Sequence, residues 1–180
     1  MHLINGVDTT AVESLTKRFE DHPEEAIAPW SSTVVWQEGF HVEVASRNHV
    51  PIVVDEPEWL AGTNRGPNPV ELLLGALGAC LTSAFIAVAS LSSVPINSLE
   101  TTVSGDVDLQ VFLGLKEGHA GFERITVQFV VDSPADDEQI RQIGAQAAKI
   151  SPVQNTLERA VRVDHRYDRP REINDGSPKA

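Results

Sequence analysis

The chain has 180 residues, which is enough for one domain with a substantial hydrophobic core. Its 26 acidic residues outnumber its 14 lysines and arginines and give a net charge of −12 at pH 7, so binding to nucleic acid or to an anionic membrane is electrostatically unfavourable. The single cysteine cannot form an internal disulfide, and no basic stretch followed by an apolar one marks a secretion signal. We therefore expect a cytoplasmic protein of one domain, with neither nucleic acid nor membrane among its partners.

The first third of the chain predicts one helix and three strands. Thr10 and Glu13 form a capping-box pattern, and apolar residues then recur at helical spacing, which predicts a peripheral helix over residues 10–21. Residues 32–54 hold three short stretches of β-branched and aromatic residues, the first two separated by a turn. They predict a hairpin with a third strand beside it.

A long connection and an uncharged run follow. The loop over residues 55–67 is rich in proline, glycine and acidic residues, and its length makes it a candidate for lining a site. The run over residues 72–91 is about as long as a membrane span, but it contains glycine, serine and threonine and has no lysine or arginine near either end. We expect a helix buried on all sides within the protein. Small residues that recur every four positions along it would let another helix approach closely: Gly75, Ala79, Ser83 and Ala87.

The second half of the chain predicts strands and further helices. Alternating apolar and polar residues over 102–115 and again over 125–131 predict two long strands paired as an antiparallel hairpin. A last strand is expected over residues 160–167. Three helix starts share a capping residue, a proline at the first helical position and an acceptor side chain two residues after the proline: Asn68-Pro69, Ser133-Pro134 and Ser151-Pro152.

This order of elements, with the stretches PNPVELLLGALGAC and SPVQNTL, resembles the OsmC/Ohr family of osmotically inducible and organic hydroperoxide resistance proteins. The resemblance covers roughly residues 30–167, which leaves residues 1–29 as an N-terminal helical extension and residues 168–180 as a tail expected to be disordered. It implies an α+β fold built as an intertwined homodimer, with antiparallel sheets around a buried central helix and sites at the subunit interface. The implied activity is thiol-dependent reduction of organic hydroperoxides.

The resemblance also implies roles for particular residues. Cys80 matches the cysteine that attacks the peroxide, whereas Ser151 occupies the resolving position and cannot form a disulfide. Glu71 lies one place after the glutamate of the peroxidase branches, and it also stands at the capping-box position opposite Asn68. Arg47 is the nearest candidate for the arginine that activates the thiolate. The sequence is most similar to the general OsmC-like branch of the family.

The chemistry of Cys80 depends on what surrounds it. A cysteine reacts as its thiolate, and an unassisted thiol is mostly protonated at neutral pH. Cys80 lies about three turns from the start of its helix, beyond the reach of the helix dipole, so it needs a cation or a hydrogen-bond donor from elsewhere in the fold. The six histidines show no metal-ligand spacing and none is near Cys80 in the sequence, so we expect no metal and no cofactor.

Two interpretations of different classes remain open. In the first, an organic hydroperoxide oxidises Cys80 to sulfenic acid and an external thiol reductant restores it, as in a single-cysteine peroxidase. In the second, the protein is a non-catalytic module that binds an apolar small molecule at the dimer interface, with Cys80 as part of the pocket lining. Trp59 of the long loop is a candidate cover for such a pocket. A cysteine hydrolase lacks a recognisable histidine partner.

Overall fold

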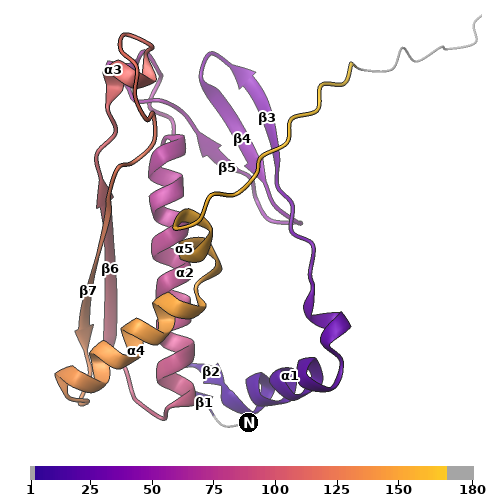
Figure 1. The fold of residues 1–180 in the computed structure, drawn as a ribbon, viewed down its shortest axis with the longest axis vertical. Helices are drawn as coiled ribbons and strands as arrows, with labels where there is room; N and C mark the ends of the chain where they lie inside the picture. Colours follow the sequence, from indigo (N-terminus) through magenta and orange to yellow (C-terminus); the bar gives the residue numbers. More distant parts are fainter. Residues whose placement is uncertain (1–2, 170–180) are drawn as a thin grey trace, which may run out of the picture.

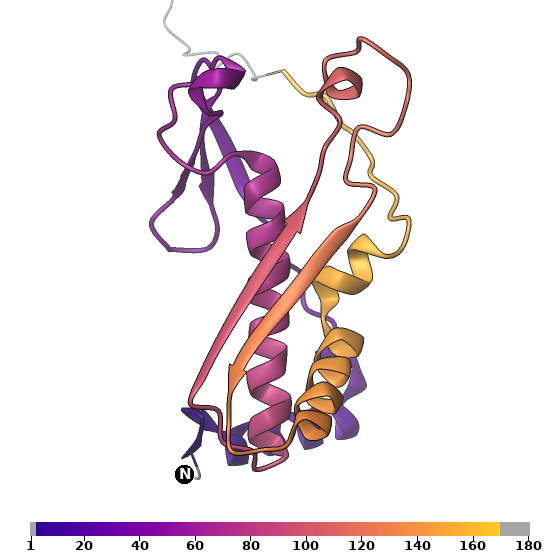
Figure 2. The ribbon, with the colours of Figure 1, turned by 90° about the vertical axis from the view of Figure 1, so that its left-hand side faces the viewer.

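The long helix α2 (Pro69–Leu91) is the axis of the fold in the computed structural model, which describes residues 3–169 (Figure 1). The antiparallel hairpin of β6 (Ser98–Gly105) and β7 (Ile125–Asp132) crosses α2 diagonally, as Figure 2 shows. Helices α4 (Asp137–Ile150) and α5 (Pro152–Leu157) also pack against α2. The result is a mixed α+β fold.

Helix α2 begins where the sequence predicts. The Asn68 side chain accepts a hydrogen bond from the Glu71 backbone N–H at 2.9 Å, and the Glu71 carboxylate accepts one from the Asn68 N–H at 2.8 Å. This reciprocal pair, with Pro69 in the first turn, is the predicted capping box. The helix ends where Ser93 takes a left-handed conformation and Pro95 follows.

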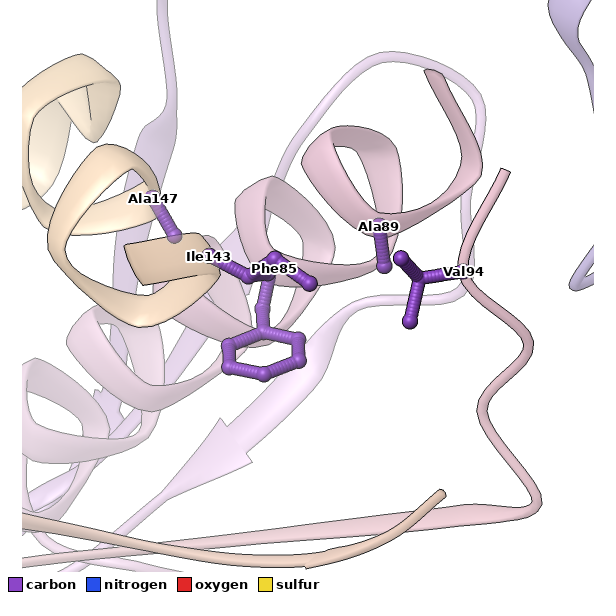
Figure 3. Packing of buried hydrophobic residues seen from close by; sticks show 5 residues of the cluster. All are labelled: Phe85, Ala89, Val94, Ile143 and Ala147. Carbon is purple, nitrogen blue, oxygen red and sulfur yellow. The ribbon is translucent and has the colours of Figure 1, made fainter. Parts of the chain in front are cut away.

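The hydrophobic core lies between α2, α4 and the β6–β7 hairpin. Phe85 of α2 is its largest member, and its ring lies 5.5 Å from that of Phe129 on β7, measured between centroids. Figure 3 shows how α2 and α4 meet around this ring. The buried members of the cluster are Phe85, Ala89, Val94, Ile143 and Ala147.

Helix α2 is buried on one face of this chain and not on all sides, so the prediction of complete burial is wrong for the single chain. Its buried positions face the hairpin and α4, whereas Gly75, Ala79 and Ser83 of the small-residue stripe are exposed and Ala87 is half-buried. By length and composition, α2 is the one helix among the described residues that is able to cross a membrane. Core helices of soluble proteins pass the same test, and α2 contributes Phe85 and Ala89 to the hydrophobic core.

The predicted hairpin and third strand are confirmed as a three-stranded antiparallel sheet in the order β3 (Thr33–Glu38), β4 (His41–Ala45) and β5 (Ile52–Val54). Every residue of β3 is exposed. Trp36, the largest of them, has 68% of its surface accessible to solvent. This chain therefore leaves an apolar sheet surface without cover.

The N-terminal residues hold a small hairpin that the sequence did not predict. Strands β1 (Leu3–Ile4) and β2 (Val7–Asp8) pair, and Asn5 between them donates to the Val94 carbonyl at 2.9 Å and accepts from the Ile96 N–H at 2.8 Å. Asn5 thereby fixes the hairpin to the C-terminal end of α2. Helix α1 (Thr9–Asp21) follows; the predicted helix is confirmed, but its cap is Asp8 rather than Thr10.

Two predicted elements of the second half end or begin elsewhere. The alternation of buried and exposed residues holds along β6 only to Gly105, because the Asp108 side chain accepts from two backbone N–H groups and starts the short helix α3 (Leu109–Phe112). Helix α4 starts at Asp137 with Asp136 as its cap, and not at Ser133-Pro134. The Ser133 hydroxyl donates instead to the Pro95 carbonyl.

The predicted last strand over residues 160–167 is not formed. Its residues are exposed, and they pair with no strand among the residues that the structure describes. An extended segment that finds no neighbour within the chain cannot form a ladder. Of the predicted disordered tail over residues 168–180, residues 170–180 lie outside the described part of the chain.

Buried Asp55 organises the loop over residues 55–67. Its carboxylate accepts hydrogen bonds from the backbone N–H groups of Glu56, Thr63 and Arg65 and from the Thr63 hydroxyl. The Thr63 hydroxyl is the main cause that holds the pKa of Asp55 below its ordinary value; burial opposes this effect, and the three backbone N–H groups reinforce it. The hydrogen bonds of Asp55 therefore hold this loop in one conformation before α2.

Gly62 is required by the close return of this loop on itself. A Cβ atom at this position would lie 1.8 Å from the Glu56 carbonyl oxygen, which is backbone and cannot turn away. The same atom at Gly144 of α4 would meet Phe85 at 3.6 Å, an ordinary van der Waals contact.

We predict that Gly62→Ala lowers the free energy of unfolding by about 2 kcal/mol or more, because the loop must open to admit the methyl group. Gly144→Ala is the matched control: it removes a glycine from a helix interior without a clash, and it should raise stability by up to about 1 kcal/mol. Urea unfolding of the two variants and the wild type measures both effects. A Gly62→Ala protein as stable as the wild type would contradict the close approach.

Candidate functional site

Cys80 and Ser151 meet in the interior although 71 residues separate them. Cys80 is partly buried on α2, and the Ser151 hydroxyl donates a hydrogen bond to its Sγ atom at 3.1 Å. Ser151 itself has no accessible surface. The residue that the resemblance predicts at the resolving position therefore lies in contact with the residue that it predicts at the peroxidatic position.

Ser151 occupies the corner between α4 and α5. Its N–H donates to the Ala148 carbonyl at 3.3 Å and ends α4, and its side chain accepts from the Gln154 N–H at 3.2 Å and starts α5. The predicted helix start at Ser151-Pro152 is thus confirmed. One hydroxyl both caps a helix and contacts the thiol.

Glu71 lies away from the thiol. It is in the first turn of α2, nine residues before Cys80, which corresponds to about 13 Å along the helix axis. Its carboxylate is engaged by the Asn68 N–H in the capping box. In this chain Glu71 has the structural role of a capping residue.

Arg47 and Arg65 are the two arginines relevant to activation of the Cys80 thiolate. Arg47 is in the turn between β4 and β5, with a left-handed backbone conformation, and no hydrogen bond or ion pair of the described residues joins it to Cys80. Arg65 does contact the first hairpin: its guanidinium lies 2.8 Å from the Glu38 carboxylate and 3.1 Å from Nδ1 of His41. Sequence reasoning missed Arg65 because the loop brings it to the hairpin from 27 residues beyond Glu38, and no local pattern signals this.

The contact between Arg65 and His41 leaves one ring nitrogen of His41 without a partner among the described residues. A guanidinium only donates, so Nδ1 of His41 accepts and Nε2 carries the proton of the neutral ring. Nε2 is buried and has no hydrogen-bond partner among the described residues. A water molecule or a group outside the described residues would satisfy a donor of this kind.

A groove of about 390 Å³ lies beside the N-terminal end of α2. The long loop contributes Trp59 to its wall, as expected for a loop that lines a site. Aromatic rings and carboxylates share the wall: Trp59, Phe112, Phe122, Glu56, Glu71 and Asp106. Cys80 is not among the lining residues of this groove.

One group of side chains at the surface has the composition of a metal site. His22, Glu24 and Glu25 bring three ligand atoms within 4.8 Å of one another, a juxtaposition that the sequence analysis did not identify. All three residues are exposed, and exposed acidic groups often cluster without binding a metal. This cluster is therefore not interpreted as a metal centre.

The helix, the flanking sheets and the partly buried cysteine define an α+β protein of the OsmC type, and the comparisons agree. A family model described as OsmC-like protein matches residues 62–166, which is more than half of the chain. The chain belongs to the OsmC-like family. No curated protein matches it.

Solved structures of similar fold come from several bacteria. An OsmC-like protein from Mycoplasma pneumoniae is 24% identical, covers 73% of this chain and 88% of its own, and has a TM-score of 0.64. An organic hydroperoxide resistance protein from Legionella pneumophila is 16% identical over 73% of this chain and 91% of its own, with a TM-score of 0.55. One from Elizabethkingia anophelis is 20% identical over 72% and 87%, with a TM-score of 0.54. At these identities the likeness is one of fold.

We predict that Ser151→Cys forms a disulfide with Cys80 after one equivalent of an organic hydroperoxide. The Ser151 Oγ and Cys80 Sγ atoms are already 3.1 Å apart, so a thiol at this position is within bonding reach once small shifts bring the sulfurs to about 2 Å. Mass spectrometry detects the loss of two hydrogen atoms. Ser92→Cys, twelve residues further along the chain from Cys80, is the control and should stay reduced. A folded Ser151→Cys protein with both thiols free would contradict the prediction.

Proposed function

We propose that this protein reduces organic hydroperoxides, with Cys80 as the reacting thiol and an external thiol as reductant. The observation that carries the proposal is the hydrogen bond between Ser151 and Cys80, which gives the single cysteine a buried donor partner at the resolving position of the family. The organic hydroperoxide resistance proteins of similar fold support the same class of substrate. The proposal includes a cytoplasmic location, where small thiols are available.

The proposed reaction has two stages. The Cys80 thiolate attacks the outer oxygen of the hydroperoxide, an S–O bond forms, the O–O bond breaks, and the alkoxide leaves as an alcohol after it takes up a proton. The cysteine is thereby oxidised to sulfenic acid and the peroxide is reduced. An external thiol then displaces water to form a mixed disulfide, and a second one releases the Cys80 thiol and an oxidised disulfide of the reductant. No second cysteine of the chain competes for the sulfenic acid.

We also propose that the working form is a homodimer. Three features of the single chain support it: the exposed apolar strand β3, the exposed residues of the small-residue stripe on α2, and the buried Nε2 of His41, which has no hydrogen-bond partner among the described residues. The extended segment over residues 160–167, exposed and unpaired in the described chain, is a fourth. A second copy would cover apolar surface that water contacts in the monomer.

A binding module for an apolar small molecule is the second candidate function. The groove beside Trp59 favours it, because its aromatic side chains suit the apolar part of a ligand. Three carboxylates share the wall and Cys80 does not line it, so Cys80 is not part of the pocket lining in this groove. The two functions differ in whether Cys80 reacts with a hydroperoxide at neutral pH.

We predict that Cys80→Ser abolishes turnover of organic hydroperoxides and leaves the fold intact, since the two side chains have nearly the same volume. Coupled assays with a small thiol as reductant measure turnover, and circular dichroism checks the fold. Ser92→Ala, an exposed position at the end of α2, should retain wild-type turnover. If Cys80→Ser keeps its turnover, or if the wild type has none, the peroxidase proposal fails and the binding module remains.

We predict that the wild type sediments as a dimer at micromolar concentration and that Ala79→Arg shifts it toward monomer. The substitution places a long charged side chain in the exposed stripe of α2, where close helix approach requires small residues. Ser92→Arg adds the same charge at the exposed end of the helix and should leave the dimer intact. Sedimentation equilibrium distinguishes the forms, and a stable folded wild-type monomer would overturn the dimer.

A further inference from the structure

We propose that Ser151 is a positioning residue that stabilises the thiolate of Cys80 by donating its hydroxyl proton to the sulfur. This inference rests on the proposed function, because it assigns a role within the same site. A capping serine needs only its acceptor lone pair, whereas Ser151 also has its proton directed at a nucleophile. The contact with Cys80 is therefore not explained by the cap.

The partners of the Ser151 hydroxyl determine the direction of its proton. A serine hydroxyl has one proton and two acceptor lone pairs. The Gln154 N–H is a donor and occupies one lone pair at 3.2 Å, so the hydroxyl proton has no role in the cap and is free to point at Sγ, 3.1 Å away. When Cys80 loses its proton, only Ser151 is able to donate in this pair. The hydrogen bond then becomes charge-assisted and favours the ionised sulfur over the neutral thiol.

The backbone around Ser151 holds the hydroxyl in place. The Ser151 N–H is bound to the Ala148 carbonyl, and the Ser151 carbonyl accepts from both the N–H and the side-chain amide of Asn155, at 3.0 and 2.8 Å. With no accessible surface, Ser151 has little room for another rotamer. The donor is thus in position before Cys80 ionises, which is the condition for effective electrostatic stabilisation.

The exchange of a resolving thiol for a hydroxyl changes the chemistry of the pair. A thiol at residue 151 would condense with a sulfenic acid on Cys80, whereas a hydroxyl forms no such bond and retains only its donor function. Residue 151 thus contacts Cys80 through a hydrogen bond and cannot bond to it covalently.

Three substitutions at residue 151 test this role through the ultraviolet absorbance of the thiolate as a function of pH, with Cys80→Ser as the blank. Ser151→Ala and Ser151→Gly both remove the hydroxyl without adding a charge beside the sulfur, and glycine is well tolerated at a helix N-cap. Both should lower the thiolate absorbance at a given pH in the titration, because the ionised sulfur has lost its hydrogen-bond donor. Ser151→Thr keeps the hydroxyl and should titrate as the wild type does. The rate of alkylation by iodoacetamide at pH 7 should fall about threefold or more in Ser151→Ala, because the smaller thiolate fraction outweighs its greater nucleophilicity.

Asp136→Ala is the matched control. It removes the side-chain cap of α4 at the Gln139 N–H, at the opposite end of that helix from Ser151, and should leave the titration of Cys80 unchanged. If one of the Ala and Gly variants does not fold, the other carries the test. A folded variant that titrates as the wild type does would show that Ser151 only caps α5. A shift without hydroperoxide turnover in the wild type would refute the proposed function and leave the role of Ser151 intact.

Discussion

The packing of α4 against α2 through Phe85 is the contact on which the candidate site depends. The aromatic ring fills the space between the two helices, with Ile143 and Ala147 of α4 beside it. Because α4 runs directly into α5 at Ser151, the position of α4 on α2 determines where the corner lies. A shift of α4 by one turn, about 5 Å, would separate the Ser151 hydroxyl from Cys80. The hydrophobic core and the polar contact are therefore parts of one arrangement.

Helix α2 divides the chain into a covered side and an uncovered one. The side that faces α4 and the hairpin is buried, and its large residues supply the core, whereas the opposite side has small residues at Gly75, Ala79 and Ser83. The β3–β4–β5 sheet adds an exposed apolar surface of its own. Burial of apolar area is the main favourable term in folding, so a chain with this much apolar surface in water lacks part of that stabilisation. This imbalance connects the fold of one chain to the proposed assembly of two.

The features that were predicted from the sequence are those set by short-range chemistry. The capping box of Asn68 and Glu71, the helix start at Ser151 and the alternation along β6 and β7 each depend on residues within a few positions of one another. The features that were missed depend on distant partners. Asn5 is fixed by Val94 and Ile96, and no local pattern indicates that an asparagine will bond to backbone groups some ninety residues away.

The end of β6 shows how a local signal can override a longer pattern. The alternation of apolar residues continues past Gly105, yet Asp108 supplies a side-chain oxygen to the backbone N–H groups of Gln110 and Val111 and turns the chain into α3. An aspartate within a strand pattern favours turns and helix caps for this reason. The ion pair of Asp108 with Lys116 holds the turn from its other side and is the largest cause of the lowered pKa of Asp108. Periodicity alone could not distinguish these outcomes.

The hydrogen-bond donor to Cys80, the Ser151 hydroxyl, is neutral, and this affects how the hydrogen bond depends on salt and pH. Among the described residues, the charged groups considered for this site have partners other than Cys80: the Glu71 carboxylate accepts from the Asn68 N–H, and the Arg65 guanidinium pairs with Glu38. A hydroxyl has no net charge, so its hydrogen bond to sulfur is screened little by salt when it is buried, and it does not titrate in the range where a thiol ionises. A histidine in the same place would lose its charge within that range. A buried serine thus offers Cys80 the same donor at every pH at which the protein is folded.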